Sequence, residues 1–222
     1  MQRNAEAKIN LLDMKKILFT GILSILFVGI SFAQSPRIGI TAGLNVSNVT
    51  TVTNNISNRM DWKAGFQVGV VSDFGISKSF SIIPELLFSQ RGTKYNSSAN
   101  NGSSITLNYL QLPINAAYKF DVGMGSKLFI FAGPYVGYGL SGSALVPVKF
   151  SSKEQDYKNI GVEDLNMYFK PFDFGINAGV GYEYEKIFFK VQYNHGFANY
   201  SNDKNTSWKN LNIGVSAGYF FN

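Results

Sequence analysis

The chain has 222 residues and is 45% hydrophobic and 15% aromatic, which is enough for one domain with a core of ordinary size. Its net charge of +6 is spread along the sequence without a basic cluster, which excludes a nucleic-acid-binding surface. Cysteine is absent and there is one histidine, so the sequence predicts no disulfide framework, no metal site and no cofactor.

Residues 1–33 have the pattern of a secretion signal. Two lysines precede an uncharged apolar run over 17–30, and the small residues Ser31 and Ala33 fit a signal-peptidase site. We therefore expect translation to start at Met14 and cleavage to follow Ala33. An N-terminal membrane anchor is the alternative, but the run is short for a span of roughly 20 apolar residues.

The remaining segment, 34–222, is expected to form one all-β domain. Apolar side chains recur at every second position, the period of a strand with one apolar face. Eight such segments are expected, at about 37–47, 61–74, 80–92, 104–120, 128–140, 171–184, 187–199 and 208–222. An even number of antiparallel strands is typical of a closed bacterial barrel, so we predict an eight-stranded, up-and-down transmembrane β-barrel.

Two segments depart from simple alternation. In the fourth, the neighbours Tyr109 and Leu110 are both apolar, which we interpret as a β-bulge. In the fifth, Phe129, Phe131 and Tyr135 share the face that should be polar, so its orientation stays ambiguous.

The connections between the segments alternate in length. Short connections are expected at 75–79, 121–127 and 185–186, and long polar ones at 48–60, 93–103, 141–170 and 200–207. Short turns on one side and long loops on the other are typical of outer-membrane barrels, with both termini and the turns in the periplasm. We therefore predict an integral outer-membrane protein surrounded by lipid and lipopolysaccharide, present as a single copy.

A soluble barrel that holds a ligand would also alternate, with its apolar face inward. Here the opposite face consists mostly of Gly, Asn, Ser and Gln, which suits a narrow polar interior better than a surface in water. Aromatic residues at the strand ends predict interfacial girdles, although aromatic residues favour strands in general. The predicted girdle residues are Trp62 and Trp208 at the loop side, and Phe74, Phe120, Tyr184 and Phe221 at the turn side.

Three segments carry a resemblance to a known family: Arg37–Asn45, Pro84–Gly92, and Tyr109–Pro113 leading into 118–120. In these segments the chain resembles the outer-membrane β-barrel family that includes the PorT-like proteins of Bacteroidetes-type bacteria. The resemblance covers the whole mature chain and implies the eight-stranded barrel, but not a role in secretion. Gln111 departs from the acidic residue common at this position, which affects one interior contact.

Alternation also predicts which charged side chains face the interior. These are Arg37, Glu85, Arg91, Lys119, Asp173, Glu183 and Lys190. Buried charges must be paired or solvated, so we predict a ladder of ion pairs that fills the lumen. Eight strands leave room for side chains and not for a diffusion pore. A narrow ion or proton path is the alternative.

Two further features bear on function. His195 is predicted on the lipid-facing side, where a lipid-modifying barrel enzyme could keep a general base, but no serine or carboxylate stands beside it. The loop 141–170 is the longest and most charged, and is the best candidate for contact with lipopolysaccharide, an envelope partner or a secretion partner. We expect a non-enzymatic role in structure, adhesion or envelope assembly.

Overall fold

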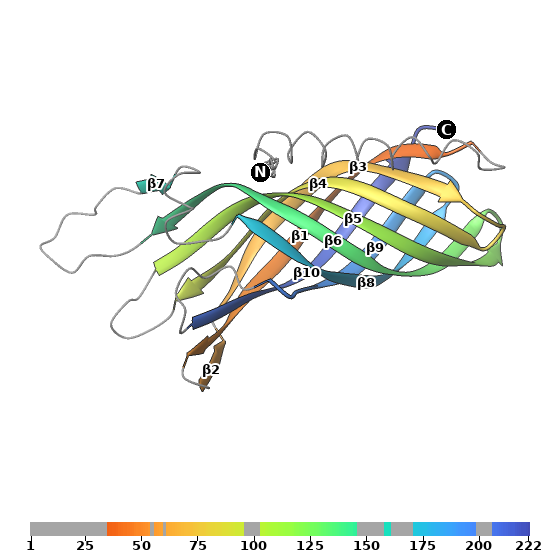
Figure 1. Ribbon diagram of the computed structural model, residues 1–222. Coiled ribbons are helices and arrows are strands. Elements are labelled where there is room, and N and C mark those ends of the chain that lie inside the picture. Colours follow the sequence, from red (N-terminus) through yellow and green to blue (C-terminus); the bar gives the residue numbers. More distant parts are fainter. Residues whose placement is uncertain are drawn as a thin grey trace, which may run out of the picture.

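The computed structural model describes residues 35–53, 56–59, 61–95, 103–145, 158–160, 171–198 and 206–222. Within them, eight long antiparallel strands form one closed barrel (Figure 1). The long strands are β1 (Arg37–Thr53), β3 (Asp61–Gly75), β4 (Phe80–Tyr95), β5 (Ser103–Gly123), β6 (Ser126–Leu145), β8 (Phe172–Tyr184), β9 (Ile187–Gly196) and β10 (Thr206–Phe220). Two short strands, β2 (Ile56–Arg59) and β7 (Lys158–Ile160), pair with β1 and β6.

The last strand closes the barrel by pairing with the first. The register of β1 and β10 runs from Gly39 opposite Phe220 to Thr53 opposite Thr206. Each of the other long strands pairs with its neighbours in chain order, so the barrel is up-and-down. Closure leaves no open sheet edge over the paired length, which is what a hydrocarbon environment requires. The described residues contain no helix long and apolar enough to cross a membrane.

Short turns join the strands at one end, which we call the turn end, and the opposite end is the loop end. The described turns connect β3 to β4, β5 to β6 and β8 to β9, as predicted. Most of the connecting residues at the loop end lie outside the described residues, as does the predicted signal segment 1–33. The end marked C in Figure 1 lies at the turn end, and there the Asn222 side chain donates to the Pro36 carbonyl at 3.0 Å, so both described chain ends lie together.

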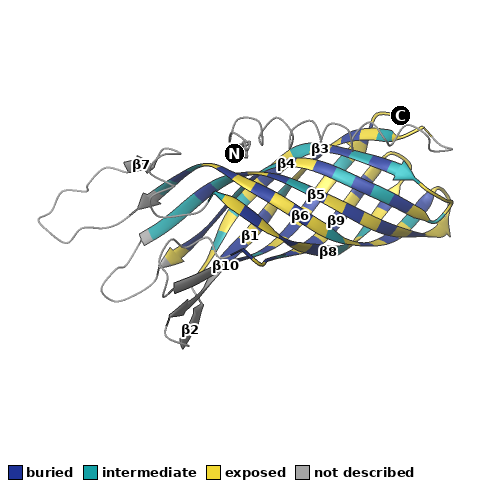
Figure 2. Cartoon of the chain, in the orientation of Figure 1, coloured by how far each residue is buried: buried dark blue, intermediate teal, exposed yellow. Residues whose placement is uncertain are grey.

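Buried and exposed residues alternate along every long strand, which gives the barrel wall a chequered pattern (Figure 2). The exposed positions are apolar: Leu44 is 72% exposed and Val180 is 56% exposed. The buried positions on the same strands are mostly polar, such as Asn45 and Asn177. The apolar face therefore points outward, which excludes the soluble barrel with an apolar ligand cavity.

Several strands continue further toward the loop end than the sequence predicted. β1 ends at Thr53 rather than near 47, because it still pairs with β10 and with β2 there. β6 ends at Leu145 rather than near 140, because β5 and β7 pair with its last residues. By contrast, β9 ends at Gly196 rather than near 199.

The predicted β-bulge is present, but it lies in the other strand. Asn108 and Tyr109 are consecutive in β5, yet they pair with Ser141 and Gly139, so the extra residue is Leu140 of β6. Burial in β5 alternates without interruption through this region, with Tyr109 inside and the next residue outside. The two adjacent apolar residues therefore face opposite sides of the wall: Tyr109 packs in the lumen and Leu110 points outward, without a change of phase in β5.

The ambiguous fifth segment is resolved by glycines on the neighbouring strand. Phe129 and Phe131 are each 5% exposed and point into the lumen from β6. Their rings cover Gly181 and Gly179 of β8, where a Cβ atom would lie 2.2 Å and 2.5 Å from the two ring Cζ atoms. The missing side chains of β8 thus provide the space that the large rings fill.

Candidate functional site: the filled lumen

Four charged side chains from four strands form a closed ring of ion pairs at the turn end. Arg37 of β1 pairs with Asp73 of β3 and, at 2.7 Å, with Glu183 of β8. Lys119 of β5 pairs with the same two carboxylates, at 3.1 Å for Glu183. We call this set the turn-end quartet. Two cations and two anions leave it neutral, which is the condition for burying it.

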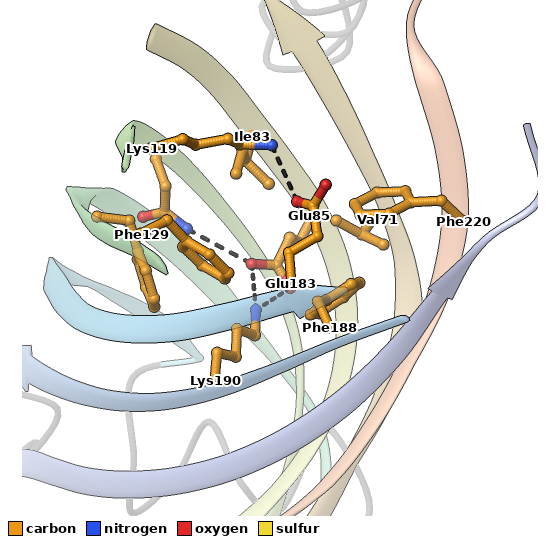
Figure 3. Close-up of a pocket in the computed structure, with 11 residues that line it drawn as sticks. Val71, Ile83, Glu85, Lys119, Phe129, Glu183, Phe188, Lys190 and Phe220 are labelled. Atoms are coloured by element: carbon orange, nitrogen blue, oxygen red, sulfur yellow. Dashed lines mark hydrogen bonds and ion pairs between the residues drawn. The ribbon is translucent and has the colours of Figure 1, made fainter. Parts of the chain in front are cut away.

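An apolar layer with one ion pair lies next to the quartet. Lys190 of β9 binds both carboxylate oxygens of Glu85 of β4, and Asn115 of β5 donates to the same carboxylate at 3.5 Å. The apolar members of the layer are Val71, Ile83, Ala117, Phe129, Phe131, Phe188 and Phe220. Figure 3 shows side chains of this layer pointing toward one another from strands around the barrel.

The space that remains inside this layer is very small. The cavity bounded by the apolar side chains, Glu85 and Lys190 has a volume of about 20 Å³. That volume holds about one water molecule. The apolar side chains and the Glu85–Lys190 pair thus fill most of the described lumen at this level.

A third network lies toward the loop end. The Arg91 side chain donates to Gln111 and Ser89, and its guanidinium lies 3.8 Å from Asp173. Asp173 also accepts hydrogen bonds from the Tyr135 hydroxyl at 3.2 Å and from Asn210 at 3.1 Å. Arg91 is 3% exposed and Asp173 is 1% exposed, so this pair is fully enclosed as well.

The structure therefore places all seven charged residues selected from the sequence inside the barrel, in three separate networks. Six are buried, and Arg37 is half-buried at the turn end. Sequence reasoning missed Asp73, which binds two of the seven. Its position was available from alternation, since Asp73 has the same parity as Val71 and Gln67 on the inner face of β3. Alternation likewise put Tyr135 on the inner face of its strand, but nothing in the sequence indicated that its hydroxyl would bind Asp173.

The six residues predicted to form interfacial girdles differ in how far their side chains are exposed. Trp62, Phe120, Tyr184 and Phe221 are exposed on the outer face near strand ends, with exposed fractions between 40% and 56%. Phe74 is half-buried. The side chain of Trp208 lies outside the described residues.

His195 lies on the outer face of β9 and is half-buried among aromatic rings. Its ring stacks on Tyr193 and meets Phe197 edge to face, with centroids 6.4 and 5.5 Å apart. Its partners on the adjacent strands are Leu211 and Ile176. These described neighbours offer neither a nucleophile nor a carboxylate, the two groups that a catalytic histidine needs.

Comparison with known proteins supplies the family. The model of the outer membrane protein beta-barrel domain matches residues 32–202, which is most of the chain. The chain belongs to this family. As a member of the outer membrane protein β-barrel family, it is an integral protein of the outer membrane. No curated protein matches.

Solved structures of outer-membrane barrels are similar to the chain at low identity. Ail of Yersinia pestis, solved with the heparin analogue sucrose octasulfate, is 14% identical, with 85% of this chain and 100% of Ail covered and a TM-score of 0.42. Neisserial surface protein A is 12% identical, with coverage of 85% and 100% and a TM-score of 0.45. OprG of Pseudomonas aeruginosa is 10% identical, with coverage of 86% and 98% and a TM-score of 0.45.

Proposed function

We propose that the protein is a non-enzymatic outer-membrane barrel that acts through its loop end, as a structural, adhesion or envelope-assembly component. The observation that carries this proposal is the filled lumen. Ion pairs and aromatic rings occupy the interior, and the cavity inside the apolar layer has a volume of about 20 Å³. With the interior closed, contact with other molecules takes place on the outer wall and at the loops.

The outer wall has the chemistry of a lipid contact. Its exposed side chains are aliphatic and aromatic on every long strand, for example Val70, Ile130 and Phe189, each at least 50% exposed. Outer-membrane lipid and lipopolysaccharide are thus the proposed surroundings, and a single barrel suffices to hold the fold. The proposed contact for an envelope or secretion partner is the loop 141–170, most of which lies outside the described residues.

A narrower assignment to the PorT-like barrels of Bacteroidetes-type bacteria is part of the proposal. It rests on Arg37–Asn45, Pro84–Gly92 and Tyr109–Pro113, which belong to β1, β4 and β5. The family assignment does not by itself imply a role in secretion, so that role needs its own test: it predicts that the protein co-isolates with a component of a secretion system after crosslinking in cells. Co-isolation with lipopolysaccharide alone would instead favour an envelope role.

Conductance measurements separate this proposal from the channel alternative. The purified protein, inserted into planar lipid bilayers, should show no steady ohmic conductance, because the apolar layer and the Glu85–Lys190 pair block the lumen. Stable unitary currents from the wild-type barrel would refute the proposal. Glu85→Gln/Lys190→Met is the matched variant, since it removes the charges of the layer without touching the loops.

Replacing loop residues 146–157 with a short Gly-Ser linker tests the proposed site of action. The barrel should keep its heat-dependent shift in gel migration, because the replacement leaves every described strand intact. Its crosslinked partner in cells should be lost. Retention of that partner by the loop variant would place the contact elsewhere.

A further inference from the structure

The side chain of Asn222 bonds the end of β10 to the start of β1 at the turn end. The Phe221 N–H donates to the Ile38 carbonyl at 2.8 Å, which continues the ladder between the two strands past the end of β10. Beyond this bond the Asn222 side chain takes the place of main-chain groups. Its Oδ1 accepts from the Ile38 N–H at 3.0 Å, and its Nδ2 donates to the Pro36 carbonyl at 3.0 Å.

The chemistry of these two partners requires an amide. Proline has no N–H, so Pro36 offers only a carbonyl acceptor, whereas Ile38 offers a donor. Asparagine and glutamine are the side chains that end in a peptide-like amide, with a carbonyl acceptor beside an N–H donor. We call the Asn222 side chain with Pro36 and Ile38 the terminal clamp.

Lys186 holds the same end of β10 from the other side. The Phe220 N–H donates to the Lys186 carbonyl at 2.8 Å, and the Lys186 ammonium donates to the Phe221 carbonyl at 3.2 Å. Residues 220–222 are therefore bonded both to the β8–β9 turn and to the start of β1. These bonds matter because β1 and β10 are paired without a turn that joins them, and chain ends without such bonds are poorly ordered.

Arg37 lies between the two residues that the terminal clamp fixes. Its guanidinium lies 4.2 Å from the centroid of the Phe220 ring and pairs with Asp73 and Glu183 of the turn-end quartet. Arg37 is the one member of the quartet that is not fully buried. Lys119 is the other cation, so release of Arg37 would leave one excess negative charge on the buried carboxylates.

We propose that Asn222 is a positioning residue for Arg37. The terminal clamp fixes the main chain on both sides of Arg37, and this directs the guanidinium into the quartet. Opening of the clamp frees the first residues of β1, withdraws Arg37 and uncovers the carboxylates of Asp73 and Glu183. The turn end of the seam is thus the place where the closed lumen can open. This inference goes beyond the proposed surface role and does not depend on it.

Amide hydrogen exchange on the full barrel in detergent micelles tests the terminal clamp. Asn222→Ala should raise the exchange rate of the Ile38 N–H about five- to tenfold, the factor equivalent to one net hydrogen bond. Asn222→Asp keeps the acceptor for this N–H and loses the donor to Pro36, so Ile38 should stay protected. The Ala178 N–H, in the middle of β8, should exchange equally in all three proteins. Equal exchange of Ile38 in wild type and the alanine variant, or equal loss of protection in both variants, would overturn the clamp.

A set of combined variants tests the positioning of Arg37. Arg37→Met/Glu183→Gln removes half of the quartet and keeps it neutral, since Lys119 still pairs with Asp73. Asn222→Ala should lower the urea midpoint of unfolding in wild type, and by less than about half as much in this background, because no guanidinium is left to position.

Arg91→Met/Asp173→Asn is the matched background, because it neutralises the ion pair of the third network instead. There Asn222→Ala should keep its full effect on the urea midpoint. An equal effect of Asn222→Ala in wild type and in both backgrounds would overturn the positioning role, because Asn222 would then act on the strand end alone. An effect reduced equally in the two backgrounds would overturn it as well, because the coupling would not be specific to the quartet.

Discussion

The Glu85–Lys190 pair allows the energetic role of the lumen to be measured. Lys190 is 5% exposed and Glu85 is 3% exposed, and each is the only charged partner of the other among the described ion pairs. Glu85→Gln therefore leaves a buried ammonium with no counter-charge. Removing one partner of a buried pair costs about 3–5 kcal/mol.

The paired substitution should behave differently. In Glu85→Gln/Lys190→Met both charges are gone, and replacement of a buried pair by neutral groups of similar volume is often neutral or stabilising. We expect each single variant to lower the urea midpoint in lipid vesicles by about 2 M, taking about 2 kcal/mol per M for the urea dependence. The double variant should return to within about 0.5 M of wild type.

The assay is the fraction of barrel that keeps its fast, unheated gel migration as a function of urea. Lys78→Met is the matched control, because this lysine is exposed in the β3–β4 turn, where substitutions change stability by less than about 0.5 kcal/mol. Single variants with the stability of wild type would show that water, and not Glu85, balances the Lys190 charge. A double variant with a urea midpoint as low as those of the single variants would show that the shape of the two side chains, and not their charge pairing, stabilises the barrel.

Three more outcomes follow from the described contacts. Gly181→Ala should destabilise the barrel by about 1–3 kcal/mol because the new methyl overlaps the Phe129 ring, whereas Gly137→Ala, with nothing closer than 3.7 Å, should change the urea midpoint little. Leu44→Arg should cost about 2–4 kcal/mol if it faces the bilayer midplane, against a smaller cost for Leu44→Ala, measured as folding yield into vesicles. His195→Ala should leave the lipid A and phospholipid profile of the outer membrane unchanged, and an altered profile would restore the enzyme alternative.

The sequence predicted the fold because one local rule governs every strand of a barrel. Alternation decides which side chains face lipid, and it requires no knowledge of the partner strand. The rule was insufficient where packing overrode polarity, most clearly in β6. Phe129, Phe131 and Tyr135 point inward because Gly181, Gly179 and Gly175 on β8 leave space for their rings. That relationship depends on the register between β6 and β8, which alternation does not supply.

The partners inside the lumen could not be predicted for a related reason. Alternation shows that a side chain faces inward but not at which height along the barrel axis. The turn-end quartet joins residues of β1, β3, β5 and β8, and Lys119 reaches across the lumen to the two carboxylates of strands that are not its neighbours. Such contacts depend on how far each strand is shifted relative to the next around the whole circumference.

Charge balance at each height indicates where the closed part of the lumen ends. The quartet, the Glu85–Lys190 pair and the Arg91–Asp173 pair are each neutral, which permits low exposure. Lys63, nearer the loop end of β3, breaks this series. Its ammonium donates to Ser104 at 3.4 Å and to the Ile105 carbonyl at 3.3 Å, and no carboxylate pairs with it among the described residues.

An unpaired lysine can stay charged only where water reaches it. Lys63 is half-buried, unlike Lys119 and Lys190, and its aliphatic chain passes over Gly92, where a Cβ would lie 3.0 Å from Lys63 Cδ. Lys63, which has no carboxylate partner among the described residues, is thus also partly exposed to water. Internal pairing closes the described lumen on the turn side of Lys63, so the search for a binding partner belongs at the loop end.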